Sequence, residues 1–349
     1  MTMELRFAFM LVLCCIPGAC AKAPDNVSAP LVYTGAVDGS AAVALDVEHF
    51  VAASDEDSVL RVYGRDRGGP PLQSIDLTQF LDVPAASPET DIEAAARIGD
   101  RAYWISSHGR NSRGQEKEGR HRFFATDIVT SERGVTLRPA GKPYQDLLRD
   151  LIAAPSLEPF RLAEAAARPP KSAGGLNIEG LCATGDRHLL IGFRNPVPQG
   201  RALLVPLLNA DAVIQGQRAQ FGPPLRLDLG GLGIRDIAFW EGEYLIVAGP
   251  SDGKGQSRLY RWAGNDQGPK LLRHVSLKGL NPEAVIVYRD RGLQQVQLLS
   301  DDSKKVQNDD AGKSEAVLGQ KQFRSIWVLL PPALRDGRLQ TTKDVNTNN

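Results

Sequence analysis

The chain has 349 residues, and its 41 basic and 41 acidic side chains give a formal net charge of zero. This balance excludes the strongly basic surface that nucleic-acid-binding proteins carry, so no nucleic acid partner is expected. The 34 glycines and 23 prolines are typical of a turn-rich β protein, and a single all-β domain can reach this length.

Residues 1–21 have the layout of an export signal. Arg6 precedes an apolar run from Phe7 to Ile16, which is too short to span a bilayer, and small residues follow it. Cleavage before Lys22 is one outcome. The other is a lipobox-like Gly18-Ala19-Cys20 that leaves a lipidated Cys20. We therefore expect an exported protein, either periplasmic or lipid-anchored in the bacterial envelope, that meets a membrane only through Cys20.

From residue 31 onward, short apolar runs alternate with turns. Four segments begin in a similar way, with a polar residue and, two residues later, an acid that precedes an apolar run. They are Asp91-Ile92-Glu93, Asn177-Ile178-Glu179, Asn281-Pro282-Glu283 and, as a weaker match, Ile234-Arg235-Asp236. Each is followed by a turn and a second apolar run, and one further second run lies upstream at Phe50–Ser54. A repeat of roughly 45–55 residues with several short strands indicates an all-β fold of the β-propeller type.

The repeat divides residues 31–330, a single propeller domain, into blades. Blade one begins at Ala41, and the later blades begin at Ile92, Ile178, Ile234 and Pro282. Helical composition and flanking prolines predict a small helical insertion at 141–172, between blades two and three. The polar tail 333–349 is predicted to be disordered.

Two incomplete parts of the pattern fit one another. The last blade has no fourth strand after Pro331, while Leu31–Val37 reads as a lone strand before blade one. Pairing of Leu31–Val37 with Phe323–Leu330 would close the ring and leave no exposed sheet edge. This favours five blades, and a sixth, degenerate blade within 120–172 is the alternative.

The register predicts one polar face around the propeller axis. In each blade the start of the first strand and the end of the second lie at the same end of the sheet. The acids at the first-strand starts are Glu93, Glu179, Asp236 and Glu283. The residues that follow the second strands are Asp55, His108, Arg194, Gly249 and Asp301.

Carboxylates that converge on one axis need a counter-charge or a structural partner. A hard cation such as calcium prefers oxygen ligands, and its candidate ligands are Glu93, Glu179, Asp236, Glu283 and Asp301. Ion pairs with Arg110, Arg194 and Arg235 are a second solution. A third is that each acid bonds the backbone of a neighbouring blade. His and Cys residues lack zinc spacing, and no organic cofactor is expected.

Other groups on the same face supply candidate roles. His108 is the candidate catalytic residue, as a general base beside the acids. The candidate binding residues are Asp55, Arg110, Asn111 and Arg194.

The motif series Asp91-Ile92-Glu93, Ser107–Asn111, Asn177–Leu181 and Asn281–Val285 resembles an uncharacterised bacterial family of secreted proteins, a domain of unknown function. The resemblance spans about residues 38–330 and implies a propeller without an established activity. More distantly, the acid-led strands are similar to those of calcium-dependent propeller hydrolases: paraoxonases, gluconolactonases and esterase-like phytases. That similarity implies a calcium-binding role for Glu93, Glu179, Glu283 and Asp301, with Asp236 in place of a glutamate.

Two functional hypotheses follow. The protein is a calcium-assisted hydrolase of an ester, lactone or phosphoester, or it is a non-enzymatic propeller that binds a small molecule or an envelope protein on the same face. A full cluster of the acids around a bound ion would favour the first hypothesis. Acids paired with Arg110, Arg194 and Arg235 favour the second. In either case we expect a monomer.

Overall fold

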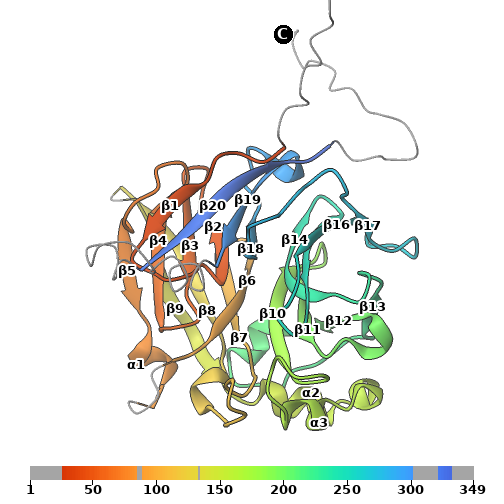
Figure 1. Ribbon diagram of the computed structural model, residues 1–349. Helices are drawn as coiled ribbons and strands as arrows, with labels where there is room; N and C mark the ends of the chain where they lie inside the picture. Colours follow the sequence, from red (N-terminus) through yellow and green to blue (C-terminus); the bar gives the residue numbers. More distant parts are fainter. Residues whose placement is uncertain (1–25, 85–88, 133, 302–320, 332–349) are drawn as a thin grey trace, which may run out of the picture.

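The computed structural model describes residues 26–84, 89–132, 134–301 and 321–331. These residues form 20 strands in five four-stranded antiparallel sheets, arranged around a central axis (Figure 1). The prediction of an all-β, five-bladed propeller is confirmed, and the described residues form no sixth sheet. The expected signal segment 1–21 and the tail 333–349 lie outside the described residues.

Four blades take their strands in sequence order. Blade one contains β2 (Ala41–Ala44), β3 (His49–Ala53), β4 (Val59–Gly64) and β5 (Gln73–Asp76). Blade two contains β6 (Ile92–Ile98), β7 (Arg101–Ser106), β8 (Phe123–Ser131) and β9 (Gly134–Tyr144). Blade three contains β10 (Asn177–Ala183), β11 (Leu189–Asn195), β12 (Ala202–Leu207) and β13 (Leu225–Leu227). Blade four contains β14 (Gly233–Trp240), β15 (Glu243–Gly249), β16 (Arg258–Trp262) and β17 (Lys270–Leu271).

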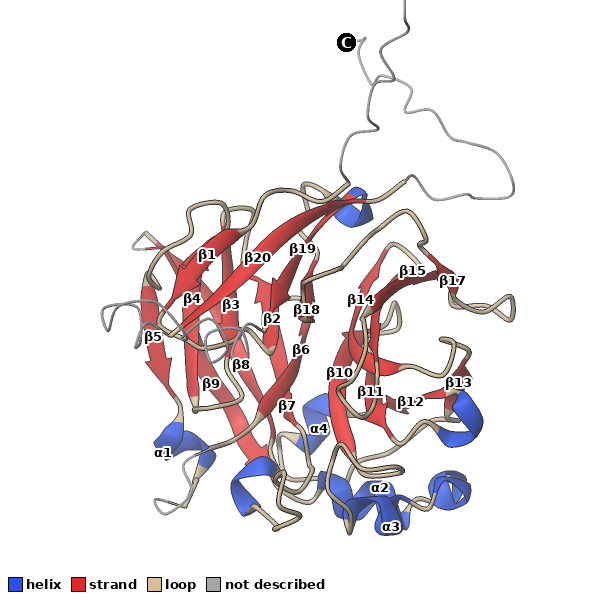
Figure 2. Ribbon diagram, viewed as in Figure 1, coloured by secondary structure: helices blue, strands red, loops and turns tan. Residues whose placement is uncertain are grey.

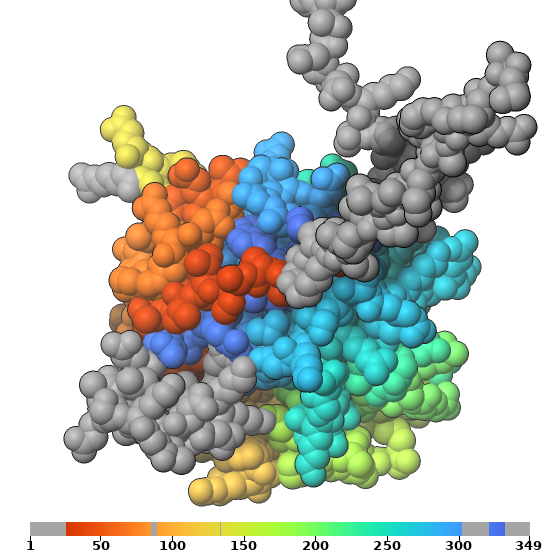
Figure 3. Space-filling model, turned by 45° about the horizontal axis from the view of Figure 1, so that its top comes forward, coloured from red at the N-terminus to blue at the C-terminus, as the bar shows by residue number. Residues whose placement is uncertain are grey.

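Blade five combines the two ends of the chain, in the order β1–β20–β19–β18. Its strands are β18 (Pro282–Ile286), β19 (Gln295–Ser300), β20 (Gln322–Leu329) and β1 (Leu31–Thr34). β1 pairs antiparallel with β20, from Leu31 opposite Ser325 to Thr34 opposite Gln322. The predicted closure is therefore confirmed, and Figure 3 shows the N-terminal segment in red lying against β20 in blue.

Each interface between neighbouring blades contains its own apolar cluster. Alternation along the strands explains this, because successive side chains point to opposite faces of a sheet. In β3, Val51 and Ala53 pack toward blade two, whereas Phe50 and Ala52 pack toward blade five. The inner strands β2, β6, β10, β14 and β18 lie side by side in a closed ring, which brings their ends together at the axis.

The helices lie in the connections between strands (Figure 2). They are α1 (Thr78–Leu81), α2 (Leu147–Ala153), α3 (Leu162–Ala166) and α4 (Ala210–Val213), and the 3-10 turns are η1 (Glu118–Arg120), η2 (Pro155–Phe160), η3 (Pro198–Gly200) and η4 (Gly292–Gln294). No helix within the described ranges is long and apolar enough to cross a membrane.

The helical insertion begins later than expected. α2, η2 and α3 lie inside the expected range 141–172, but residues 141–144 are the end of β9. β9 is the outermost strand of blade two, where prolines such as Pro139 and Pro143 are tolerated. Ala140 and Tyr144 are buried, so β9 packs against the core as far as its last residue.

Candidate functional site

A one-residue bulge interrupts four of the five inner strands near their start. The pairing skips from Ile92 to Ala94, from Ile178 to Gly180, from Ile234 to Asp236 and from Pro282 to Ala284. A bulge leaves the extra residue unpaired and re-aims its side chain. The extra residues are Glu93, Glu179, Arg235 and Glu283.

In blade four the repeat position therefore belongs to Arg235, and not to Asp236 as the sequence predicted. Asp236 is buried, and its carboxylate accepts hydrogen bonds from the backbone N–H groups of Ile237 at 2.8 Å and Val285 at 2.7 Å. Burial raises the pKa of Asp236 well above its usual value. Asp236 thus ties blade four to the backbone of blade five and has a structural role.

Glu179 and Glu283 form a network with two arginines. Glu179 accepts hydrogen bonds from Arg194 and from the Asn177 amide, both at 2.6 Å. The Arg235 Nε lies 3.4 Å from the second Glu179 oxygen, and the Arg235 guanidinium also forms an ion pair with Glu283. Burial alone would raise the pKa of Glu179, but the two arginines hold it below its usual value. Blades three, four and five therefore contribute paired charges.

A second group of acids lies between blades one and two. One carboxylate oxygen each of Asp55, Asp91 and Glu93 lies within 4.8 Å of the others. Glu93 has no hydrogen-bond partner among the described residues, and Arg120 donates to Asp91 at 2.8 Å. We call Asp55, Asp91 and Glu93 the carboxylate cluster.

Asp38 extends this cluster on the side of blade one. Asp38 accepts hydrogen bonds from the Asp55 backbone N–H and from the Ser54 hydroxyl, both at 3.2 Å. Burial raises the pKa values of Asp38 and Asp55, and the charge of Asp301 adds to the shift of both. Asp301 itself accepts a hydrogen bond from Asn281 at 3.0 Å.

The carboxylate cluster is short of positive charge. Burial raises the pKa of Asp38 to about 6, that of Asp91 to about 7 and that of Asp55 to about 9. Burial also raises the pKa of Glu93 well above its usual value, and the neighbouring carboxylates raise it further. Protons therefore neutralise part of the cluster at neutral pH, and a bound cation would provide the same compensation.

His108 does not lie beside the carboxylates. It is buried, its Nδ1 is 2.8 Å from the Ser106 carbonyl oxygen, and its ring faces His121 with 5.6 Å between the ring centres. Burial lowers the pKa of His108 to about 3. The register explains the difference. Ile105 pairs with Ala94 in blade two, as Ala53 pairs with Ala41 in blade one. Asp55 lies two residues after Ala53, so its counterpart, two residues after Ile105, is Ser107 and not His108.

Arg110 and Asn111 support loops instead of facing the acids. Arg110 donates to the carbonyl oxygens of Ala166 at 2.9 Å and Gly114 at 3.1 Å. The Asn111 side chain accepts from the backbone of residues 113 and 115 in its own turn. Arg120 was not identified from the sequence, but it forms an ion pair with an acid of the site, Asp91, as was expected of Arg110.

Residues 131–278 match the profile of a family described as "Protein of unknown function (DUF3616)". The chain is similar to an uncharacterised family. The predicted resemblance is thus confirmed, over somewhat less than half of the chain. No curated protein sequence matches.

Solved structures with a similar fold include the glutaminyl cyclase of Myxococcus xanthus, with 11% identity over 87% of this chain and 97% of that chain and a TM-score of 0.40. The PQQ-bound aldose sugar dehydrogenase of Streptomyces coelicolor has 13% identity over 85% and 98%, also with a TM-score of 0.40. Virginiamycin B lyase from Staphylococcus aureus has 6% identity over 87% and 100%, with a TM-score of 0.37. At such low identity the likeness concerns the fold alone.

The carboxylate cluster predicts how stability depends on pH in the presence of a chelator. Because the pKa of Asp55 is raised from 3.8 to about 9, the folded state keeps a proton that the unfolded state releases above pH ~4. The free energy of unfolding should therefore fall as the pH rises, by roughly 2 kcal/mol per retained proton between pH 7 and 8.5. His108 does not contribute in this window, because its pKa is lowered to about 3.

Denaturant unfolding at the two pH values measures this effect. Asp55→Asn should flatten the slope, since an amide does not ionise, whereas the exposed control Asp266→Asn should keep it. A wild-type stability that is constant or rises from pH 7 to 8.5 would contradict the prediction.

Proposed function

We propose that this protein is an exported propeller whose carboxylate cluster binds a divalent cation of the calcium type and uses it on an ester, lactone or phosphoester. The observation that carries the proposal is the convergence of Asp55, Asp91 and Glu93 within 4.8 Å. These acids come from two neighbouring blades, and the loop after β3 and the bulge in β6 position them.

The donor set fits a hard cation. The cluster offers only carboxylate oxygens, which calcium prefers, and neither His nor Cys belongs to it. The Glu93 carboxylate makes no hydrogen bond to any residue in the described ranges, so both of its oxygens are available. The raised pKa of Asp55 supports the proposal further, because burial and the neighbouring Asp38 carboxylate hold a proton on it that a cation could replace, whereas Asp91 is already paired with Arg120.

Asp55, Asp91 and Glu93 would hold the ion, which would polarise a substrate oxygen and lower the pKa of bound water. The protein's own groups divide the remaining work. Glu93 would offer one oxygen to the ion and its other oxygen to a proton, whereas the ring of His108 faces His121. The Glu179–Arg194–Arg235 network forms a rigid, buried flank in which each charge already has a partner.

A second candidate function is a non-catalytic propeller that binds a small ligand or an envelope protein on this face. The pairing of Glu179 and Glu283 with arginines favours it, because these acids are then unavailable as ligands. Asp236 is likewise unavailable, since the backbone of blade five occupies it.

Calcium should raise the melting temperature of the wild type relative to chelator. A site that binds only the folded state contributes about 2.7 kcal/mol when the free ion is at 100 times its Kd. Glu93→Gln should abolish the difference, whereas the exposed control Glu132→Gln should retain it. Equal wild-type melting temperatures in calcium and in chelator would reject the cation site.

Turnover separates the two functions. Chromogenic aryl esters, lactones and phosphoesters should be hydrolysed in calcium and not in chelator, and Glu93→Gln should lose this activity. Calcium binding without turnover of any of the three substrate classes would favour the binding protein.

A further inference from the structure

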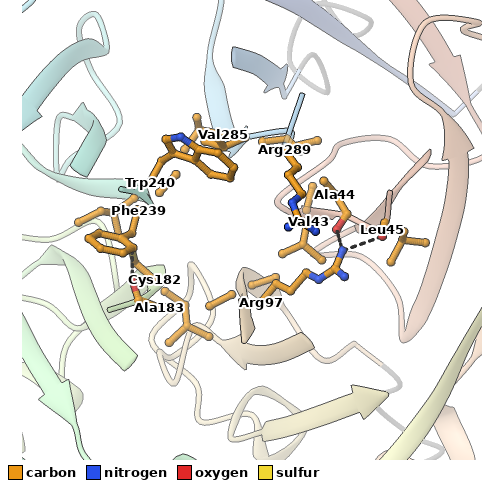
Figure 4. Close-up of a pocket in the computed structure, with 18 of the residues that line it drawn as sticks. Val43, Ala44, Leu45, Arg97, Cys182, Ala183, Phe239, Trp240, Val285 and Arg289 are labelled. Atoms are coloured by element: carbon orange, nitrogen blue, oxygen red, sulfur yellow. Dashed lines mark hydrogen bonds between the residues drawn. The ribbon is translucent and has the colours of Figure 1, made fainter. Parts of the chain in front are cut away.

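A separate cavity opens at the opposite end of the axis. The last residues of the five inner strands, and the turns that follow them, enclose about 670 Å³ (Figure 4). This volume suits a small organic molecule. Along β6, Glu93 of the carboxylate cluster and Arg97 of the cavity are four residues apart, which corresponds to roughly 13 Å of strand.

One wall of the cavity carries a fixed cation, Arg97. Its Nη1 donates to the carbonyl oxygens of Ala44 at 2.9 Å and Leu45 at 2.6 Å, and its Nε donates to Gly99 at 2.7 Å. Its Nη2 reaches Asp100 only at 3.5 Å. These bonds hold the guanidinium in place and leave one Nη2–H for a ligand.

A second cation, Arg289, lies beside the first. Figure 4 shows the guanidinium groups of Arg97 and Arg289 on the same side of the opening. Arg289 is exposed, and its side chain makes no hydrogen bond or ion pair to the part of the chain that the structure describes. Burial lowers the pKa of Arg97, Asp100 and Asp46 raise it in part, and the charge of Arg289 lowers it slightly, as expected for two neighbouring cations.

Two acids also line the cavity without cancelling this charge. Asp46 is already bonded to its own turn: its carboxylate accepts from the backbone of Glu48 and His49 at 2.7 Å and contacts the His49 ring. The Asp100 side chain is 89% exposed, so water screens it.

The opposite wall is aromatic and apolar. Phe239, near the end of β14, lies across the opening from the two arginines, and Trp240 lies between Phe239 and Arg289, beside Val285 (Figure 4). Val43, Cys182 and Val285 complete an apolar lining from three other blades. Both aromatic rings are partly exposed, although the blade interfaces bury most large apolar side chains.

We infer that this cavity binds a small organic anion, a carboxylate carried on a flat aromatic body. The carboxylate would pair with Arg289 and with the remaining Nη2–H of Arg97, which relieves the repulsion between the two cations. The aromatic body would pack against Phe239 and Trp240. A neutral molecule of the same shape would leave Arg289 without a counter-charge and would give Arg97 only its 3.5 Å ion pair with Asp100.

Calorimetric titration with 1-naphthoate and with its uncharged counterpart 1-naphthalenemethanol tests this inference. The wild type should bind one naphthoate at least tenfold more tightly than the alcohol. Arg289→Gln should remove this preference, and the exposed control Arg273→Gln should keep it. Trp240→Leu should weaken the binding of both molecules and leave the ratio between them.

Equal affinity of the wild type for the two molecules, absence of binding, or a preference that survives Arg289→Gln would overturn the inference. The titration is carried out in chelator, and unchanged melting temperatures of the variants confirm that they fold. A negative result for the cavity therefore does not bear on the proposed cation site, and a negative result for the cation site does not bear on the cavity.

Discussion

Replacement of Tyr33 by alanine should lower the free energy of unfolding by about 3–5 kcal/mol, the usual cost of removing a large buried aromatic side chain. Tyr33 lies in β1, is fully buried, and packs against Phe50, Tyr63 and Phe323 with ring centres 5.2 to 5.4 Å apart. Its hydroxyl also donates to the Arg65 carbonyl oxygen at 2.5 Å. One substitution thus removes much of what attaches the N-terminal strand to the ring.

Val32→Ala is the matched control, because Val32 precedes Tyr33 in the same strand and is 42% exposed. A change of about 0.5 kcal/mol or less is expected there. Guanidinium unfolding monitored by circular dichroism measures both variants. A loss below 1 kcal/mol for Tyr33→Ala would mean that β1 is dispensable for ring stability.

Arg235→Gln should cost about 3–5 kcal/mol at pH 7, since it leaves Glu283 without its counter-charge and removes one of the two arginines that pair with the buried Glu179. The side chains of Arg235 and Glu179 are 3% and 5% exposed, and that of Glu283 is 14% exposed. The exposed control is Arg161→Gln, which breaks a pair with Glu164 whose side chains are 72% and 50% exposed. Such surface pairs contribute about 0–1 kcal/mol.

The cost of Arg235→Gln should depend on pH. The pKa of Glu179 is lowered in the folded state, so its ion pairs stabilise the fold above its usual value of 4.5 and lose this contribution as the pH falls through the lowered pKa. Unfolding free energies of wild type and variant should therefore converge as the pH falls through the lowered pKa of Glu179. A difference that persists unchanged at low pH would show that Arg235 acts through packing and not through charge.

The repeat pattern predicted the blades because each blade buries its strands in the same way. Three of the inner strands, β2, β6 and β18, begin at the predicted residues Ala41, Ile92 and Pro282. The closure was predictable because blade five lacked one strand and Leu31–Val37 lacked a partner. Both predictions rest on apolar patterning and unpaired edges, which are visible in a sequence.

The site was less predictable because it depends on single-residue shifts. A bulge at Arg235 moves the repeat position one residue away from Asp236, and successive strand residues face opposite sides. The same kind of shift separates His108 from the acids. Asp38 had a detectable signal, because it precedes Ala41 by the same spacing that separates Asp91 from Ala94.

Charge pairing could not be predicted because the partners come from distant loops. Arg120, in the turn η1, reaches Asp91 across 29 residues of sequence, and Arg218 near α4 reaches Asp150 in α2. Arg110 has the same charge as Arg120, but its loop directs it to backbone oxygens. The residue type determines the sign of a charge, whereas the fold determines which residues the charged side chain contacts.

The shared blade sets the order in which the protein can be completed. β1 lies near the start of the chain and β20 near its end, so the last blade forms only after residue 329 has been made. At synthesis rates of about 5–20 residues per second, β1 waits roughly 15–60 s for its partner. Contacts this distant in sequence form slowly. A chain that is exported unfolded would postpone this final pairing until both ends have crossed, so ring closure would take place in the compartment where the protein resides.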